Sequence, residues 1–421
     1  MLGGPVHPAA RRSVARLWLA LFLIAAASSL YQWLGLGHAG VFAALIQSSF
    51  DMAKLAVTIS IGLVGVLALW LGLFRIAELA GLMDILARAL TPLFRRLMPQ
   101  VPAGDPALGS VTMNLAANML GLDNAATPLG LKAMQDLQSL NEGSATASNA
   151  QILFLVLNTS SVTLLPVTIF MFRAQQGSAD PAAVFIPILL ATSASTVVGL
   201  LAVAAVQRLR LFDPVVLAYG AGLALVVAAL GSWFAPLPAS ALAERSSLLG
   251  NLLLFTVIIV FLLAGWRRRV NVYEAFIEGA RGGFKVGVEL IPYLVAMLVA
   301  IGVFRASGAL DVLLHGLRWV FSALGLNTDF IPALPTAMLK PLSGSGARAM
   351  MLETMHTYGV DSFPARLAAT IQGSTETTFY VLAVYFGSVG IRRTRHAVAC
   401  GLLADLAGIV TAILVGYWFY R

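Results

Sequence analysis

Nine apolar stretches of about 20 residues recur along this chain of 421 residues and limit what it can fold into. A helix of that length spans the hydrocarbon core of a bilayer. Only 11% of the residues are charged, against about 25% in a soluble domain. We therefore predict an all-α polytopic membrane protein. Its expected spans are residues 17–36, 55–74, 150–172, 182–206, 214–234, 249–266, 286–304, 364–386 and 397–420.

The first apolar stretch has two interpretations. It follows Arg11, Arg12 and Arg16, and it contains small residues around Ala25 that fit a cleaved signal peptide. We favour a retained signal anchor at residues 1–40, because the apolar run continues past the small residues and is long enough to cross.

Two of the expected spans are interrupted by polar residues. One interruption is Asn-Thr-Ser-Ser-Val-Thr at 158–163, and the other is Gln-Gly-Ser-Thr-Glu-Thr at 372–377. Polar and ionisable groups at membrane depth are costly, so they usually line a cavity or bind a partner. Matching interruptions in two halves of a chain indicate a transporter binding site between repeats. We call these segments the first and second breaks.

Two further segments are too polar, and too rich in glycine and proline, to face lipid. They are residues 111–128 and residues 332–348. Non-helical backbone at membrane depth must be buried in protein or line a cavity. We expect two re-entrant or broken helical segments there, each preceded by an interfacial amphipathic helix near residues 76–98 and 306–326.

The order of these features repeats along the chain. Residues 44–54 align with residues 275–285, which brings Lys54 onto Lys285. Five expected spans separate the two lysines, so the second repeat begins on the opposite side of the membrane and is inverted. We place an N-terminal helix at 1–40, the first repeat at 41–212, connecting helices at 213–269 and the second repeat at 270–421.

The distribution of basic residues favours a cytoplasmic N-terminus. With that orientation most arginines fall on the cytoplasmic side, including Arg267, Arg268 and Arg269, as the positive-inside rule requires. The formal charge of +8 has this origin, and we predict no nucleic-acid partner. The single cysteine, Cys400, excludes an internal disulfide and a cysteine-rich metal cluster.

Glu376 is the first candidate for chemistry. A carboxylate within a span is costly unless it is neutralised or paired, so we expect a ligand-binding or proton- or cation-coupling role. The structural alternative is an ion pair with Lys340 or Arg348. Lys340 precedes a Ser-Gly-Ser-Gly run, at 343–346, that we expect to open a helix whose free N–H groups suit an anion.

Asn114 and Asn118 are the counterparts in the first half. They are four residues apart and share a helical face, where amides can bind a polar uncharged ligand. Interhelical hydrogen bonding is the alternative, worth about 0.6–2 kcal/mol per bond. Asp405 in the last span is a further acid with no obvious partner in the sequence.

Two sets of strings resemble a known family. Residues 114–130 and 157–161 look like spore maturation protein A, and residues 340–348 and 372–377 look like spore maturation protein B. The chain resembles a fusion of the two, and it is identified as a member of the nucleoside-recognition, or gate-domain, superfamily. That resemblance implies two gate-type repeats, polar gate motifs at both breaks and a bacterial inner membrane. The superfamily name does not itself establish nucleoside binding.

These observations together predict a transporter of a small polar or anionic solute that works by alternating access. A non-transporting scaffold for cell-envelope processes is the main alternative. A second alternative is a membrane enzyme acting on a lipid-linked substrate, but no convincing set of nucleophile, base or metal ligands is present, so we do not expect an enzyme. A channel is a third possibility. We expect the lipid bilayer and a small molecule or ion as partners, no cofactor or metal, and leave a homo-oligomer open. The expected site residues are Asn114, Asn118, Asp123, Asn124, Asn158, Thr159, Ser160, Lys340, Ser343, Ser345, Arg348, Gln372, Ser374, Thr375, Glu376 and Thr377.

Overall fold

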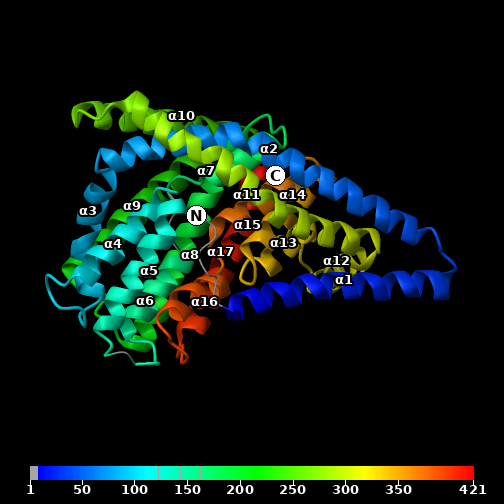
Figure 1. Cartoon of the computed structure of the whole chain (residues 1–421), viewed down its shortest axis with the longest axis horizontal. Helices are drawn as coiled ribbons and strands as arrows, with labels where there is room; N and C mark the ends of the chain where they lie inside the picture. The colour runs from blue at the N-terminus through cyan, green and yellow to red at the C-terminus, as the bar shows by residue number, and fades with distance from the viewer. Residues whose placement is uncertain (1–7, 122, 143, 161–162) are drawn as a thin grey trace.

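The computed structural model describes residues 8–121, 123–142, 144–160 and 163–421, with the backbone alone at residues 8–14, 123–125, 239, 240 and 243. The described chain is almost entirely helical (Figure 1). The predicted all-α fold is confirmed. Ser161 and Val162 of the first break lie outside the described residues.

Two series of seven α-helices follow each other along the chain, and each series includes one 3-10 turn at a different place. The first series is α2 (Val41–Leu79), α3 (Leu82–Leu97), α4 (Pro106–Met119), α5 (Asp123–Ser139), α6 (Asn149–Thr159), α7 (Val167–Gln175), the 3-10 turn η1 (Pro181–Val184) and α8 (Phe185–Gln207). The second is α11 (Val272–Ala306), α12 (Ala309–Ala323), η2 (Ile331–Ala333), α13 (Leu334–Leu339), α14 (Gly344–Tyr358), α15 (Phe363–Ser374), α16 (Thr378–Ser388) and α17 (Ala397–Tyr420). Outside the series are α1 (Pro8–Leu36), α9 (Pro214–Phe234) and α10 (Ala239–Arg267).

Seven helices in the described chain are long and apolar enough to cross a membrane. The other two of the nine predicted spans are each divided between two shorter helices, α6 with α7 and α15 with α16. The division falls at the two polar breaks. The described chain therefore has seven continuous spans rather than nine, because the polar breaks end the helix in the other two.

The longest helices, α2 and α11, lie side by side in opposite directions (Figure 1). Glycines permit this close approach. A Cβ atom on Gly283 would lie 2.5 Å from the backbone N of Ala68, and one on Gly279 would lie 2.4 Å from the carbonyl oxygen of Leu71. Small residues allow helix backbones to approach in this way in membrane proteins. These two helices contain the segments that align in sequence.

A second pair of equivalent helices, α8 and α17, packs at the centre of the molecule. Gly199 of α8 faces Ala404 of α17, and Ser195 of α8 faces Gly408 of α17, so this pair is also antiparallel. Equivalent helices that pack antiparallel are related by a rotation that reverses helix direction. That is the geometry of the predicted inverted repeat.

The two predicted interfacial segments, α3 and α12, begin alike. Each follows a glycine with a positive φ, 71° at Gly81 and 70° at Gly308. A side chain at either glycine would be strained in this left-handed conformation, which turns the chain sharply after the preceding long helix. The predicted re-entrant segments appear next, as the helical hairpins α4–α5 and α13–α14.

Candidate functional site at the meeting of the two breaks

Both polar breaks are places where a helix ends and another begins. In the second break α15 ends at Ser374, Thr375 is fully extended (φ −148°, ψ 170°) and α16 begins at Thr378. In the first break α6 ends at Thr159 and α7 begins at Val167. The terminal N–H and C=O groups of four helices are therefore available at the breaks rather than used within a helix.

The two breaks meet through the backbone. The N–H of Glu376 donates to the carbonyl oxygen of Thr159 at 2.8 Å. The equivalent helices α8 and α17 flank this contact. Thr196 of α8 donates from its hydroxyl to the carbonyl of Ser160, and Gly401 of α17 packs against Thr378. The structure therefore brings together polar segments that are more than two hundred residues apart.

Lys340 lies on the second-repeat side of this junction. Its side chain is only 3% exposed, and its Nζ donates to the carbonyl oxygen of Gln372 at 2.8 Å. The N–H of Phe379 donates to the carbonyl of Pro341 at 3.0 Å, and Gly344 packs against the Thr377 side chain. The start of α14 and the start of α16 thus converge beside a buried ammonium group.

The Ser-Gly run begins α14 as predicted. The Ser343 hydroxyl accepts from the N–H of Gly346 at 3.1 Å, which makes Ser343 the N-cap, and it lies 3.2 Å from the Ser345 hydroxyl. Such a cap stabilises a helix by about 1 kcal/mol. Arg348 stacks over the Phe172 ring of α7 at 5.3 Å. Ser343 therefore caps α14 beside the junction, whereas Arg348 contacts an aromatic ring of the first repeat.

Three asparagines occupy the first-repeat side. Asn118 donates to the side-chain oxygen of Asn158 at 2.8 Å, and Asn158 donates to the carbonyl of Phe154 at 2.9 Å. Asn114 donates to the carbonyl of Ala126 at 2.7 Å. The predicted pair on α4 thus reaches the first break through Asn158. The side chains of Asp123 and Asn124 lie outside the described residues.

Glu376 differs from the rest of the predicted set. Its side chain is exposed, and it forms no ion pair within the described part of the chain. Lys340, an expected counterion, instead binds the Gln372 carbonyl. Most of the other predicted side chains are buried, among them Asn114, Asn158, Thr159, Ser160, Ser343, Gln372, Ser374, Thr375 and Thr377.

Some buried polar atoms at the junction have no hydrogen-bond partner among the described residues. They include Gln372 Oε1, Thr375 Oγ1 and Asp405 Oδ1. Buried polar groups in folded proteins are nearly always hydrogen-bonded, so each exception needs an explanation. A bound ligand, water or proton would supply the missing partner.

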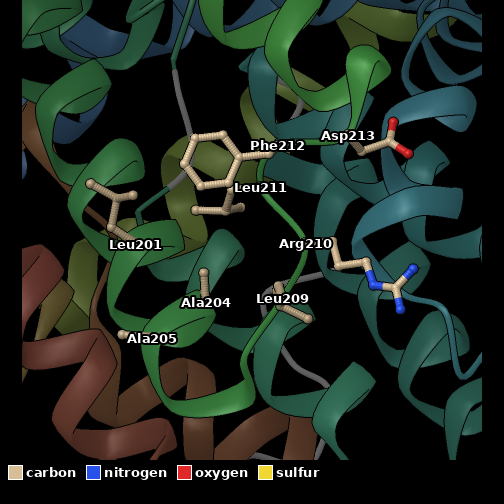
Figure 2. Close-up of a pocket in the computed structure, with 8 residues that line it drawn as sticks. All are labelled: Leu201, Ala204, Ala205, Leu209, Arg210, Leu211, Phe212 and Asp213. Atoms are coloured by element: carbon tan, nitrogen blue, oxygen red, sulfur yellow. The ribbon is translucent and has the colours of Figure 1, made fainter.

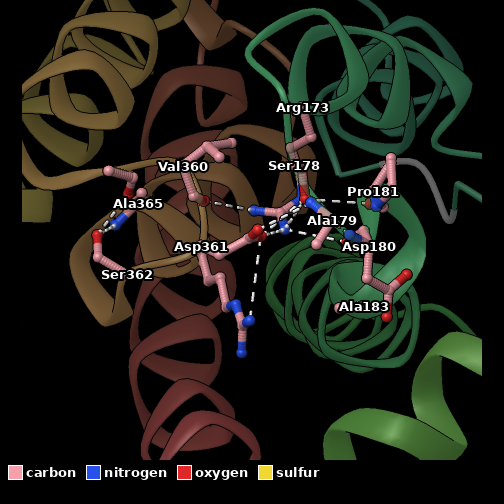
Figure 3. Close-up of polar contacts among 12 residues, drawn as sticks. Arg173, Ser178, Ala179, Asp180, Pro181, Ala183, Val360, Asp361, Ser362 and Ala365 are labelled. Carbon is pink, nitrogen blue, oxygen red and sulfur yellow. Dashed lines mark hydrogen bonds and ion pairs between the residues drawn. The ribbon is translucent and has the colours of Figure 1, made fainter.

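Sequence reasoning missed a second polar cluster, centred on Arg173 of α7 (Figure 3). The Arg173 side chain is fully buried and binds the carbonyls of Asp180, Pro181 and Val360, the Ser178 hydroxyl and, at 2.7 Å, the Asp361 carboxylate. Burial pushes the pKa of Asp361 upward, but hydrogen bonds from Ser178 and Ala179 and the charge of Arg173 outweigh burial and lower this pKa. The cluster joins the first repeat to the α14–α15 turn of the second.

Figure 2 shows a pocket of about 740 Å³. It is lined by the C-terminal part of α8 and the following loop, including Leu201, Arg210, Phe212 and Asp213. None of the predicted site residues lines this pocket. Its apolar lining near a basic loop does not match the polar chemistry of the breaks.

The fold and the site define a polytopic helical membrane protein with two inverted repeats, each carrying one broken helix. The sequence model of the Gate family, described as nucleoside recognition, matches residues 60–175 and 288–392, which together make about half of the chain. Both matches include a predicted broken segment and all or most of the α6–α7 or α15–α16 pair. The chain belongs to the Gate family.

Two curated relatives come from Bacillus subtilis (strain 168). Spore maturation protein B is 47% identical over 159 residues, which cover 38% of this chain and 88% of the relative. Spore maturation protein A is 46% identical over 146 residues, which cover 35% of this chain and 74% of the relative. The resemblance to this pair is confirmed. No solved structure matches the chain significantly.

Proposed function

We propose that this protein transports a small polar or anionic solute across the bacterial inner membrane. In this proposal the solute binds where the two breaks meet, and the repeats rock against each other to expose the site to either side in turn. Inverted repeats with broken helices at their interface are the usual construction of such carriers.

The observation that carries the proposal is the unpartnered Gln372 Oε1 at the junction. The Gln372 side chain is 7% exposed, and its own backbone carbonyl already binds Lys340. An interhelical packing site would satisfy this amide oxygen, because leaving it bare costs about 1–3 kcal/mol. A solute hydroxyl or N–H group would satisfy it and gain that free energy.

The groups around Gln372 indicate the class of solute. The Lys340 ammonium and the first turns of α14 and α16 favour an anionic or electron-rich group. The amides of Asn118 and Asn158 on the other repeat can both donate and accept hydrogen bonds. A nucleoside-like solute fits this combination, and the exposed Glu376 carboxylate beside it is our candidate for coupling transport to a proton or cation.

A scaffold role in the cell envelope is the second candidate. The names of the two relatives refer to spore maturation, and the burial of most junction side chains also suits a closed, purely structural interface. The two candidates differ in what a junction variant does. A carrier loses ligand binding while it stays folded, whereas a scaffold changes only in stability.

A thermal-shift screen of the purified full-length protein tests the proposal. The ligands are nucleosides, nucleotides and small anionic metabolites. A ligand present at 100 times its Kd stabilises the folded protein by about 2.7 kcal/mol. We expect a ligand that raises the Tm of the wild type and that has little effect on Gln372→Ala or Asn158→Ala.

Asn251→Ala is the matched control, because Asn251 is an exposed amide on α10 that bonds only to Ser247 among the described residues. This variant should respond like the wild type. A hit in the screen should then be taken up by proteoliposomes, and Glu376→Gln should slow that uptake. If every folded variant responds as the wild type does, the site is not at the junction.

A further inference from the structure

Asp405 is a buried acid at the junction that the proposed transport site does not use. It lies near the middle of α17, and its side chain is 1% exposed. Its Oδ2 accepts a hydrogen bond from the Thr378 hydroxyl at 2.6 Å, whereas its Oδ1 is buried without a hydrogen-bond partner among the described residues. An acid in the middle of a spanning helix is functional by default.

Two glycines hold α17 against the second break on either side of Asp405. A Cβ atom on Gly401 would lie 2.9 Å from Thr378 Cγ2, and one on Gly408 would lie 2.7 Å from Thr375 Cγ2. Asp405 is four residues after the first glycine and three before the second, so it shares their helical face. The Asp405 side chain therefore packs against the second break, next to Thr375 and Thr378.

Thr375 carries a second buried oxygen atom without a hydrogen-bond partner among the described residues. This atom is Oγ1, and its hydroxyl group interacts with the Asp405 carboxyl group. Both oxygen atoms are therefore buried, and neither has a partner among the described residues that meets normal hydrogen-bond geometry. A threonine hydroxyl can donate to a carboxylate or accept from a carboxylic acid. A proton on Oδ1 would satisfy both atoms and would also remove a buried charge.

Two charged groups act on the Asp405 carboxyl group from the second repeat. They are Lys340 and Glu376, and their charges act in opposite directions. The Lys340 ammonium donates to the Gln372 carbonyl, and its charge also acts on Asp405. The contacts that α6 and α8 make nearest to Asp405 come from uncharged residues, Thr159 and Ser195.

We propose that Asp405 is the buried proton-binding site of this protein, with the proton on Oδ1 donated to Thr375 Oγ1 while Thr378 donates to Oδ2. The inference deepens the proposed transport function and rests on it for its purpose. A bare carboxylate here would cost several kcal/mol, so the group takes up a proton from water and stays neutral. Release of that proton to water leaves a charge between α17 and the break, which favours a conformation that admits water.

Infrared difference spectroscopy of the full-length protein in lipid tests this inference directly. We expect the carbonyl stretch of a protonated carboxylic acid at neutral pH. Asp405→Asn, which keeps the size of the side chain, should abolish that band. Asp311→Asn is the control, and it should keep the band because Asp311 is an exposed acid on α12, outside both breaks.

Thr375→Val provides a second readout that does not depend on removing the acid. It keeps the volume of the side chain but removes the acceptor, so the band should move to higher frequency. The proposal is overturned if the wild type lacks the band, if Asp405→Asn retains it, or if Thr375→Val leaves its frequency unchanged. None of these readouts requires a transported solute, so failure of the transport proposal would be seen separately in the uptake assay.

Discussion

At the scale of single residues, the sequence predicted local features but not the contacts between distant segments. Both breaks could be predicted because each polar run lies between apolar residues in the sequence. The partner of Asp405 was not readable, since Thr378 lies 27 positions earlier and the contact depends on how α17 crosses the break. Arg173 looked like a charge at the end of a span, and only the fold shows that Asp361, 188 positions away, binds it.

The pair Arg173–Asp361 gives a prediction for pH dependence. The pKa of Asp361 is lowered from its ordinary value of 3.8, because the opposing hydrogen bonds and the Arg173 charge outweigh the effect of burial. A carboxyl group with a lowered pKa stabilises the folded protein above pH 3.8, and this stabilisation is lost as pH falls through the folded-state value. We expect the wild-type Tm to fall in that acidic window.

Asp361→Asn should lower stability at neutral pH by about 1.5–3 kcal/mol, the range for a hydrogen bond to a charged group. The Tm of this variant should also fall less than that of the wild type as the pH is lowered into the acidic range. Asp311→Asn is the control, because Asp311 is exposed and forms no ion pair in the described chain. A fall in Tm at acidic pH that is unchanged in Asp361→Asn would show that other carboxyl groups dominate it.

At the scale of elements, the sequence identified each helix type but not how the longest helices pack. The repeat alignment paired α2 with α11 as equivalents, yet nothing in an alignment says that equivalents touch. The chain contains 38 glycines, so the sequence did not show which of them lie between α2 and α11. The structure shows that Gly279 and Gly283 face backbone atoms of α2, which fixes the separation of the two helices.

Gly283 and its neighbour Gly282 make a matched test of this packing. A Cβ atom on Gly283 would lie 2.5 Å from a backbone atom of Ala68, whereas one on Gly282 would lie 3.5 Å from the flexible Leu71 side chain. We expect Gly283→Ala to push α11 off α2 and lower the Tm of the purified protein. Gly282→Ala should keep or raise the Tm, since alanine favours a helix by about 1 kcal/mol over glycine. Equal changes in Tm for the two variants would mean that the α2–α11 interface can accommodate a Cβ atom at Gly283.

At the scale of the whole molecule, the sequence predicted the inverted repeat and the family, and both agree with the structure and the comparisons. The domain boundaries at residues 40, 212 and 269 remain predictions, although each falls between helices. The number of continuous spans came out lower than predicted because hydropathy averages across a break of a few residues. The burial of the junction side chains could not be predicted from the sequence, since burial depends on all the elements around them.

The orientation in the membrane is a prediction at this scale. Phe212 and Ala235 flank α9 at its two ends, and Phe212 is 90% exposed. With the N-terminus in the cytoplasm, Phe212→Cys should react with a membrane-impermeant thiol reagent only from the cytoplasmic side. Ala235→Cys should react only from the other side. Both variants need Cys400→Ala, which removes the single native thiol, as background. The reverse labelling pattern would refute the orientation.

The bond between the two breaks joins main-chain atoms, the N–H of Glu376 and the carbonyl of Thr159. A main-chain contact survives most side-chain replacements, so mutations can alter the chemistry around it without separating the repeats. The side chains around this contact are therefore free to diverge faster than the framework that holds them. We expect members of this family with quite different side chains at the breaks to share this one contact.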